Sequence, residues 1–236
     1  MGKTSAAVNL AALAAQSGPR TLLWDLDPQA AATHCLHLKP KLKGGAERLL
    51  GGHRDGLATV ARPTDLERLY VVPADTTLRD TERLLGRARR PSRLIRKLLG
   101  TVKGDIDVVI LDTPPGLGAL TEVVAENADL LLLPVVPTPL AVRAFESYVD
   151  FLADRDTPKD LFAPFLSMID RRKPIHRQIE ADIRKDKRFL GAAVPESSAV
   201  ERMGERRAPT VVSSPHCTAS QQYRKLWAEA AERGNV

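Results

Sequence analysis

The sequence predicts an α/β protein built on a doubly wound, mostly parallel sheet with helices on both faces. Its apolar segments of strand length are continuous rather than alternating, which is typical of strands that are buried on both sides. Segments of helical character separate these strands along the chain, as parallel neighbours require. We expect residues 1–236 to form one domain, because single α/β domains often run to about 200–250 residues.

The expected elements have recognisable ends. The helix at residues 4–16 is rich in Ala and Leu and stops before Gly18-Pro19, while the strands at 21–25 and 107–112 both end in Asp. The other expected strands cover residues 69–73, 130–136, 162–169 and 189–194. The other expected helices cover residues 77–85, 87–99 (broken by Pro91), 117–127, 139–153, 174–185, 198–205 and 218–232. The glycine-rich residues 39–56 are expected to form a loop-like insertion.

Composition excludes several classes of protein. A hydrophobic fraction of 43% and a charged fraction of 27% argue against a disordered chain. Aromatic residues make up only 4%, which argues against base-stacking surfaces. Two cysteines, Cys35 and Cys217, cannot form a disulfide framework and are typical of a reducing cytoplasm. No apolar run approaches the roughly 20 residues of a membrane span.

The first motif stands at the very start of the chain. Gly2-Lys3-Thr4-Ser5 runs directly into a helix, like the last half of a phosphate-binding loop. The N–H groups of a helix N-terminus face an anion, a lysine neutralises phosphate oxygens, and a hydroxyl reaches magnesium. The same four residues also fit an ordinary helix start with a Thr or Ser cap, so the fragment alone is a weak signal.

Two further motifs follow apolar strands. Asp25 and Asp27 flank a turn, where they could hold a magnesium-bound water or orient an attacking one, or could simply form an Asp-Pro turn. Asp112 ends the most apolar strand in the Walker-B arrangement, in which a carboxylate at the strand tip holds the metal or its water. Ligands of open α/β sheets bind at the carboxyl ends of the strands, so the order and spacing of the three motifs are more specific than any one alone.

Four segments carry a resemblance to a known family. GKTSAAVNLAALAA, LLWDLDPQAAAT, VVILDTPPGLGALT and LLLPVVPTPLAVRAF closely resemble the ParA family of partition ATPases, part of the deviant Walker A group that also includes MinD and the iron protein of nitrogenase. The resemblance extends over residues 2–232. It implies an ATP hydrolase that uses ATP and Mg²⁺, forms a homodimer in the ATP state, binds DNA non-specifically and responds to a ParB-like activator. It further implies chromosome or plasmid partition in the bacterial cytoplasm, on the nucleoid. The C-terminal helix, with Tyr223, Leu226 and Trp227, lacks the long basic amphipathic character of a membrane-targeting tail, which argues against membrane binding.

The resemblance also implies roles for individual residues. Lys3 and Asp27 take the catalytic positions, the first binding phosphate and the second activating water, while Thr4 and Asp112 take the metal-binding positions. The implied nucleotide-binding residues are Gly2, Lys3, Thr4, Ser5, Asp170 and Pro195, of which the last two fall near the family's adenine site.

The sequence departs from the family at its start. Family members carry KGGVGKT, whereas the present sequence opens one residue before GKT and lacks the signature lysine, two glycines and the first strand. Because that strand is central in a parallel sheet, we expect a gap flanked by two unpaired strand edges, at a cost comparable to a domain's net stability of about 5–15 kcal/mol. Met1 stands where the family has Val, and the Val codon GTG can serve as a bacterial start codon. Our hypothesis is that the sequence is truncated because the start of its gene has been misplaced. An in-frame KGG upstream supports it and an in-frame stop codon contradicts it.

Basic residues of the C-terminal half are candidates for DNA binding, since the resemblance implies such contacts and phosphate contacts need Lys and Arg. The alternative is a solvated helix face, because acidic residues are interleaved with the cations. The candidates are Arg171, Arg172, Lys173, Arg177, Arg184, Arg202, Arg206 and Arg207. A separate basic run, residues 87–97, has the same ambiguity and less support from the family.

Two other functions remain open at this point. A ParA relative could position another cargo, such as a carboxysome, a chemotaxis cluster or the cellulose synthase machinery. Alternatively, the chain could be an ATP-incompetent fragment that binds DNA or protein. An iron–sulfur function like that of the nitrogenase iron protein is disfavoured, because Cys35 and Cys217 do not form the paired cysteines that a cluster needs.

Overall fold

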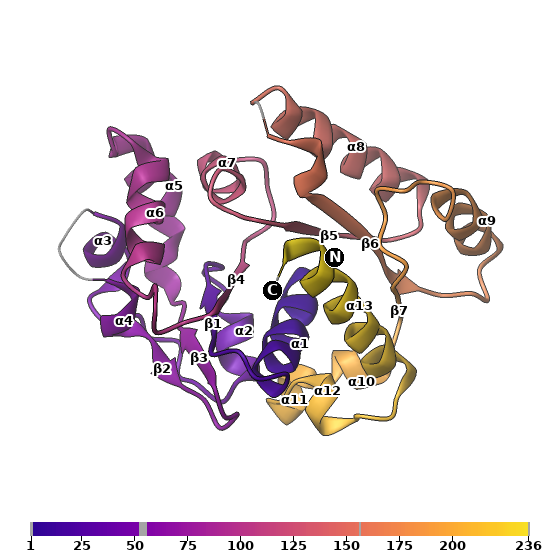
Figure 1. Cartoon of the computed structure of the whole chain (residues 1–236), viewed down its shortest axis with the longest axis horizontal. Coiled ribbons are helices and arrows are strands. Elements are labelled where there is room, and N and C mark those ends of the chain that lie inside the picture. The colour runs from indigo at the N-terminus through magenta and orange to yellow at the C-terminus, as the bar shows by residue number, and fades with distance from the viewer. Residues whose placement is uncertain (1, 52–55, 156, 236) are drawn as a thin grey trace.

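The computed structural model describes residues 2–51, 56–155 and 157–235, and it shows mostly parallel strands covered by helices (Figure 1). Parallel pairing joins neighbouring strands throughout, except that β2 runs antiparallel to β3. One sheet has the order β2 (Arg62–Pro63), β3 (Leu69–Val72), β1 (Thr21–Asp25), β4 (Val108–Asp112). The other has the order β5 (Leu131–Val135), β6 (Phe162–Ile169), β7 (Ala193–Pro195). The predicted α/β class with a mostly parallel sheet is confirmed.

The helices connect and cover these strands. They are α1 (Lys3–Gln16), α2 (Ala31–Cys35), α3 (Gly45–Leu50), α4 (Leu57–Val60), η1 (Thr76–Asp80), α5 (Thr81–Arg87), α6 (Pro91–Gly100), α7 (Ala119–Ala125), α8 (Pro139–Ala153), η2 (Lys159–Leu161), α9 (Pro174–Ile183), α10 (Ser198–Glu201), α11 (Met203–Arg206), α12 (Thr210–Ser213) and α13 (Thr218–Gly234). Among the described residues, no helix combines the length and the apolar character needed to cross a membrane.

Several of the expected elements need correction. The helix expected at 198–205 is divided at Arg202 into α10 and α11, and the one expected at 77–85 is divided into η1 and α5. Pro91 begins α6 rather than breaking a helix, because the first helical position needs no backbone N–H and suits the fixed φ of proline. The strand expected at 189–194 is confined to Ala193–Pro195, and outside it the N–H of Ala192 donates to the Glu229 carboxylate of α13. The insertion at 39–56 contains α3 and is not wholly a loop, although its residues 52–55 lie outside the described part.

Helix α1 lies at the centre of the molecule. Every residue from Ala6 to Ala15 is buried, as expected of a helix surrounded by protein on all sides. The many alanines let neighbouring elements approach closely, and α1 packs beside α13 between the two sheets (Figure 1). This packing holds the N-terminal end of α1 at the carboxyl ends of β1 and β4, where the predicted motifs lie.

The two sheets face each other along unpaired edges. Within the described ranges, no strand pairs with the outer edge of β4 or of β5. The three central residues of β4 are only partly buried, and those of β5 likewise, although all six are apolar or proline. Ile110 of β4 and Leu132 of β5 pack against the same cluster, which includes Leu10 of α1 and Tyr223 of α13. These are the two unpaired edges that are expected from the sequence.

A buried amide ties α1 to the C-terminal segment. Asn9 is 0% exposed; its Oδ1 accepts from the N–H of Val211 at 3.0 Å, and its Nδ2 donates to the Ser5 carbonyl at 2.7 Å. Nothing in the sequence singles out Asn9, because a lone Asn within an Ala-rich helix carries no pattern.

Asn9→Ala is expected to lower the free energy of unfolding by about 1–3 kcal/mol, because it leaves the Val211 N–H buried and without a partner. Urea unfolding followed by circular dichroism measures this loss. Gln221→Ala serves as the control, since Gln221 is exposed and bonds only to a nearby carbonyl. Equal effects of the two variants would contradict the structural role of Asn9.

Candidate functional site

The three predicted motifs meet at one edge of the sheet. Asp25 and Asp112 end the adjacent parallel strands β1 and β4 in direct register, and the N–H of Leu26 donates to the Asp112 carbonyl at 2.8 Å. The ammonium of Lys3, in the first turn of α1, donates to the carbonyl of Pro114 at 2.7 Å. Residues separated by more than a hundred positions in the sequence therefore form one cluster.

Gly2 shapes the start of α1. Its φ of 97° lies in the left-handed region, and a Cβ there would lie 2.5 Å from Oγ of Ser167, so glycine suits both the conformation and the space. No acidic side chain occupies the first turn of this 14-residue helix. The helix therefore presents its positive end and its first N–H groups toward the sheet edge, where they can bind an anion.

Lys3 lies between the N-terminus of α1 and the carboxylates of Asp27 and Asp112. Burial lowers the pKa of its ammonium, while the nearby carboxylates of Asp112 and Asp27 raise it. Its hydrogen bond to Pro114 leaves two other N–H donors for a ligand. A lysine in this position can neutralise an anion held at the N-terminus of α1.

Asp112 is a buried carboxylate without a satisfactory partner. It is 2% exposed, and neither of its carboxylate oxygens accepts a well-formed hydrogen bond within the described residues. Burial, reinforced by Asp25 and Asp27, raises its pKa to about 7, although the nearby hydroxyl of Thr4 and the charge of Lys3 lower it in part. Such an unpartnered carboxylate next to a hydroxyl has the oxygen chemistry that Mg²⁺ prefers.

The described side chains do not form a complete metal cage. In the part of the chain that the structure describes, no group of three or more His, Cys, Asp or Glu side chains is placed to hold a metal ion. Mg²⁺ commonly binds through one or two protein oxygens together with waters and substrate phosphates. Thr4 and Asp112 therefore fit Mg²⁺ that arrives with a phosphate ligand.

The two acids after β1 have different environments. Asp25 is 0% exposed and accepts from the N–H and the hydroxyl of Thr33 at 2.8 and 2.7 Å, while burial raises its pKa. Asp27 is only half-buried, and one of its oxygens accepts from the N–H of Gln29 at 2.9 Å. The structure thus makes Asp25 a structural acid that anchors α2 and leaves Asp27 accessible to a water molecule.

A pocket of about 300 Å³ opens beside this cluster. Gly2, Thr4 and Ser5 line it at the start of α1, and Pro195 at the end of β7 also lines it. Asp170 does not; its carboxylate binds Arg172 at 2.8 Å and is held well below its usual pKa by that arginine. Of the two residues predicted to lie near adenine, one therefore lines the pocket.

Most residues that line this pocket were not predicted from the sequence, and Met168 and Cys35 are two of them. Met168 lines it with a φ of 53°, a conformation that nothing in the sequence indicates for a non-glycine residue. Cys35 lines it too, and burial raises the pKa of its thiol. Only the folded chain brings them beside the start of α1.

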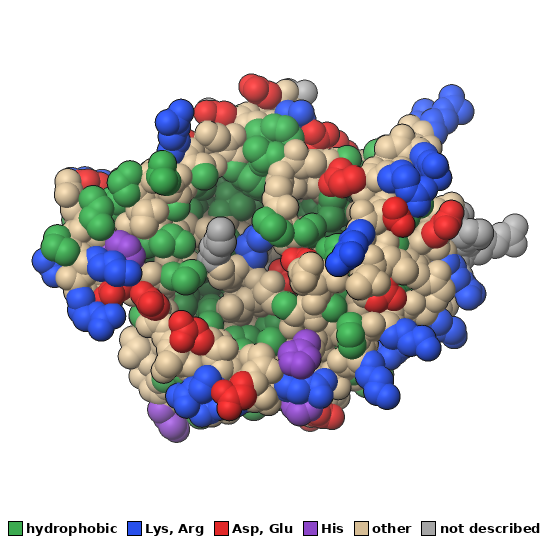
Figure 2. Space-filling view, turned by 180° about the vertical axis from the view of Figure 1, so that it is seen from behind, with side chains coloured by type: hydrophobic (Ala, Val, Ile, Leu, Met, Phe, Trp, Pro, Cys, Tyr) green, Lys and Arg blue, Asp and Glu red, His purple; other side chains and the backbone are tan. Residues whose placement is uncertain are grey.

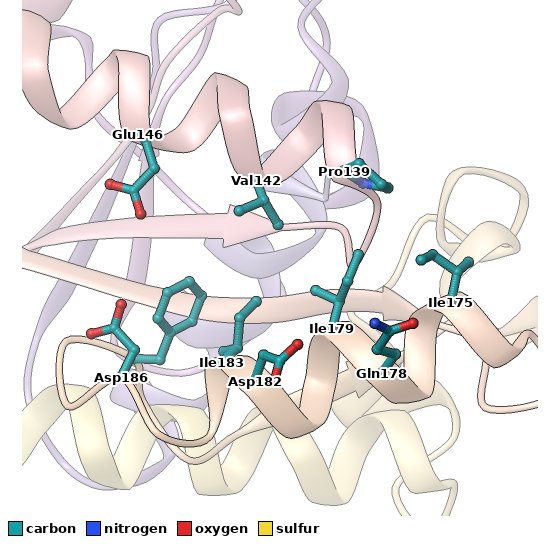
Figure 3. Close-up of a pocket in the computed structure, with 10 residues that line it drawn as sticks. Pro139, Val142, Glu146, Ile175, Gln178, Ile179, Asp182, Ile183 and Asp186 are labelled. Carbon is teal, nitrogen blue, oxygen red and sulfur yellow. The ribbon is translucent and has the colours of Figure 1, made fainter.

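A second pocket, of about 460 Å³, lies between α8 and α9 (Figure 3). Its walls include Val142, Ile179 and Ile183, and three acids line it as well (Figure 3). Two of these acids, Glu146 and Asp186, bind the same guanidinium, that of Arg188, at 2.7 and 2.6 Å. A pocket lined by carboxylates suits a phosphate ligand less well than the N-terminus of α1 does.

All eight C-terminal cations predicted to bind DNA form bonds within the chain. Arg171 and Arg184 both bind the Glu180 carboxylate, at 2.9 and 2.7 Å, and Arg172 binds Asp170. The remaining five bind an acid, a backbone carbonyl or a serine hydroxyl: Lys173, Arg177, Arg202, Arg206 and Arg207. Their contact with DNA stays a prediction, and it requires these bonds to be shared or exchanged.

Comparisons with known proteins show which proteins this chain is similar to. The model of a family described as an AAA domain matches residues 1–157. The chain is 28% identical over 245 residues to the chromosome partitioning protein ParA of Caulobacter vibrioides, covering 99% of this chain and 90% of that protein. It is 30% identical over 234 residues to a ParA family protein of Chlamydia pneumoniae, covering 96% of this chain and 91% of that protein.

A solved structure shows the same fold. The cobyrinic acid a,c-diamide synthase of Mycobacterium smegmatis, crystallised with an ATP analogue and magnesium, superposes with a TM-score of 0.78 at 24% identity. The match covers 100% of this chain and 92% of that one.

Proposed function

Because the chain belongs to the ParA family of partition ATPases, we propose that it binds ATP with Mg²⁺, hydrolyses it, and uses the nucleotide to switch between monomer and dimer during chromosome or plasmid partition. The observation that carries this proposal is the meeting of Lys3, Asp27 and Asp112 around the N-terminus of α1. Three sequence motifs that are weak separately form one site with the charges that phosphate transfer needs.

Each residue has a distinct task in this proposal. The first N–H groups of α1 and the ammonium of Lys3 bind the phosphates of ATP, and Lys3 stabilises the charge that develops on the transferred phosphoryl group. Thr4 and Asp112 hold Mg²⁺, which neutralises phosphate charge when bound. Asp27 accepts a hydrogen bond from the water that attacks the terminal phosphorus, and ADP leaves with the electrons of the broken bond.

The pocket provides a place for the rest of the nucleotide. Ser5 and Pro195 both line the pocket; in our proposal Ser5 adds a phosphate contact at the start of α1 and Pro195 contacts the purine base. Asp170 does not line the pocket, and its carboxylate already binds Arg172. In our proposal it therefore acts on nucleotide binding only through the residues next to it.

Partition requires partners beyond the nucleotide. In our proposal the ATP-bound homodimer binds DNA without sequence preference on the bacterial nucleoid, and a ParB-like protein stimulates hydrolysis and thereby releases the dimer. The names of the relatives support this proposal, because they include chromosome partitioning proteins aligned over nearly the full chain.

Nucleotide binding tests the proposal most directly. We expect the 236-residue chain to bind a fluorescent ATP analogue saturably, to require Mg²⁺ for full affinity, and to gain a dimer peak in light scattering when the analogue is bound. Thr4→Val should weaken the Mg²⁺ dependence. Glu146→Gln, in the pocket between α8 and α9, should leave binding unchanged.

Two results would contradict the proposal. Binding that excess ATP fails to displace would mean that the chain is an ATP-incompetent protein. Loss of binding in Glu146→Gln but not in Thr4→Val would place the nucleotide between α8 and α9 instead of at the start of α1.

A further inference from the structure

One segment of this protein carries many cations and no acid. Residues 83–104 contain eight Lys and Arg residues and no Asp or Glu. The whole chain carries a net charge of +6, so the remainder of the chain has two more acids than cations. The segment comprises the end of α5, the connection to α6, α6 itself and the residues that follow it. The net charge of this segment therefore makes it able to attract a polyanion.

The cations of α6 and of the connection that precedes it are exposed to solvent. Ile95 and Leu98 are buried against the core, whereas Arg93 and Lys97, at the spacing of one helical turn, are exposed. Figure 2 shows blue side chains along the edge formed by α5 and α6, at the upper right of that view. We call the following group the arginine face: Arg87, Arg89, Arg90, Arg93 and Lys97.

The arginine face differs from the C-terminal cations in its bonding. Among the described residues, no side chain of the arginine face forms a hydrogen bond or an ion pair, whereas each of the eight C-terminal candidates has an intramolecular partner. Like charges four positions apart, such as Arg93 and Lys97, also repel each other and destabilise an isolated helix. A polyanion along this face would relieve the repulsion without breaking an existing ion pair.

The chemistry of the face favours one kind of polyanion. Residues 83–104 contain no aromatic residue on which unstacked bases could lie, which argues against single-stranded nucleic acid. None of the exposed large apolar side chains in the described part belongs to α5 or α6, which argues against insertion into a lipid surface. The ten residues of α6 extend about 15 Å, and duplex DNA carries one charge per about 1.7 Å of axis, so one face of the helix can meet several phosphates.

We propose that the arginine face is the principal surface through which this protein contacts the phosphate backbone of duplex DNA. The proposal assigns the contact to α5 and α6 instead of the C-terminal cations, and it rests on the DNA-binding part of the proposed function. The contact is independent of base sequence, because guanidinium and ammonium groups bind phosphates without reading base edges.

The test compares two triple variants of equal charge change. The first is Arg89→Gln, Arg93→Gln and Lys97→Gln on the arginine face, and the second is Arg177→Gln, Arg184→Gln and Arg202→Gln among the C-terminal cations. Fluorescence anisotropy measures binding to a duplex of random sequence over a range of salt concentrations, with and without ATP and Mg²⁺. ATP turnover and circular dichroism are measured on every variant, so that loss of DNA binding is distinguished from loss of fold or of ATPase activity.

We expect the arginine-face variant to bind DNA about 100-fold more weakly at 0.1 M salt, and its salt slope to fall by about 0.9 for each phosphate that the variant no longer neutralises. The C-terminal variant should change affinity by less than about threefold. A third variant that keeps the charge, with Arg89→Lys and Arg93→Lys, should retain most of the binding, since a non-specific phosphate contact depends mainly on charge.

Other outcomes would overturn the inference in distinguishable ways. If the C-terminal variant loses DNA binding and the arginine-face variant keeps it, the inference is wrong while the proposed function stands. If the wild-type protein binds no duplex but hydrolyses ATP, both the inference and the DNA-binding part of the proposed function fail. Binding of the arginine face to vesicles of anionic lipid, with no binding to DNA, would replace DNA by a membrane.

Discussion

Lys3→Met is expected to lower ATP turnover by about 100- to 1000-fold, the loss typical of removing one group that stabilises the charge of a transition state. The ammonium of Lys3 lies within the electrostatic reach of Asp112 and Asp27, and it is half-buried, so water cannot fully replace it. Methionine keeps much of the length and the apolar stem but removes the charge and the donors that bind Pro114 and phosphate.

The measurement is release of inorganic phosphate at saturating ATP, together with the dissociation constant of an ATP analogue. Lys43→Met makes the same chemical change at an exposed lysine and should alter neither value. Turnover of Lys3→Met within tenfold of the wild type would contradict the role of Lys3 and would move the phosphate site away from the N-terminus of α1.

Asp27→Ala is expected to leave ATP binding intact and to abolish turnover. Asp27 is half-buried at the end of β1, and its carboxylate is bound only at one oxygen, by the N–H of Gln29, among the described residues. Alanine therefore removes an acceptor for the attacking water, which typically contributes about 100- to 10,000-fold to a rate, without removing a phosphate contact.

Asp25→Ala is the matched variant for this prediction. It removes the acid two positions earlier, whose carboxylate binds Thr33 twice inside the protein, so it should lower the melting temperature instead of acting on turnover alone. Single-turnover measurements on both variants separate the two roles. Undiminished turnover of a well-folded Asp27→Ala protein would exclude Asp27 as the residue that orients water.

Much of the local structure could be predicted from sequence pattern. The bounds of β1, β6 and α8 agree with the expected ranges, because continuous apolar runs end at Asp or Pro and leave little choice of boundary. The short β7 was predicted poorly, since its limits depend on side chains of α13 that accept hydrogen bonds across the molecule. A sequence pattern reports neighbours along the chain and not neighbours in space.

The residue types of the candidate site could be predicted from the sequence, but the hydrogen-bond partners and the exposure of these residues could not. Lys3, Thr4 and Asp112 were identified because each follows or precedes a regular element at a recognisable spacing. That Asp25 is structural while Asp27 is accessible depends on Thr33, which reaches Asp25 only after α2 folds against β1. The sequence likewise could not show that Arg171 binds Glu180, because that bond depends on how the loop before α9 turns back on the helix, whereas the bond from Arg184 to Glu180 has the i,i+4 spacing of a helix.

The sequence by itself determined the α/β class, the resemblance to the ParA family and the three motifs of the proposed phosphate site, because residue type and spacing follow from the chemistry of phosphate binding and from the periods of strand and helix. The tertiary structure decided which charged side chains are free to bind another molecule. The eight C-terminal cations predicted to bind DNA are bonded within the chain, those of the arginine face are exposed without partners in the described part, and Asp112 is buried with its carboxylate unsatisfied. Sequence specifies which groups ionise, but only packing sets whether each is paired, buried or free to bind another molecule.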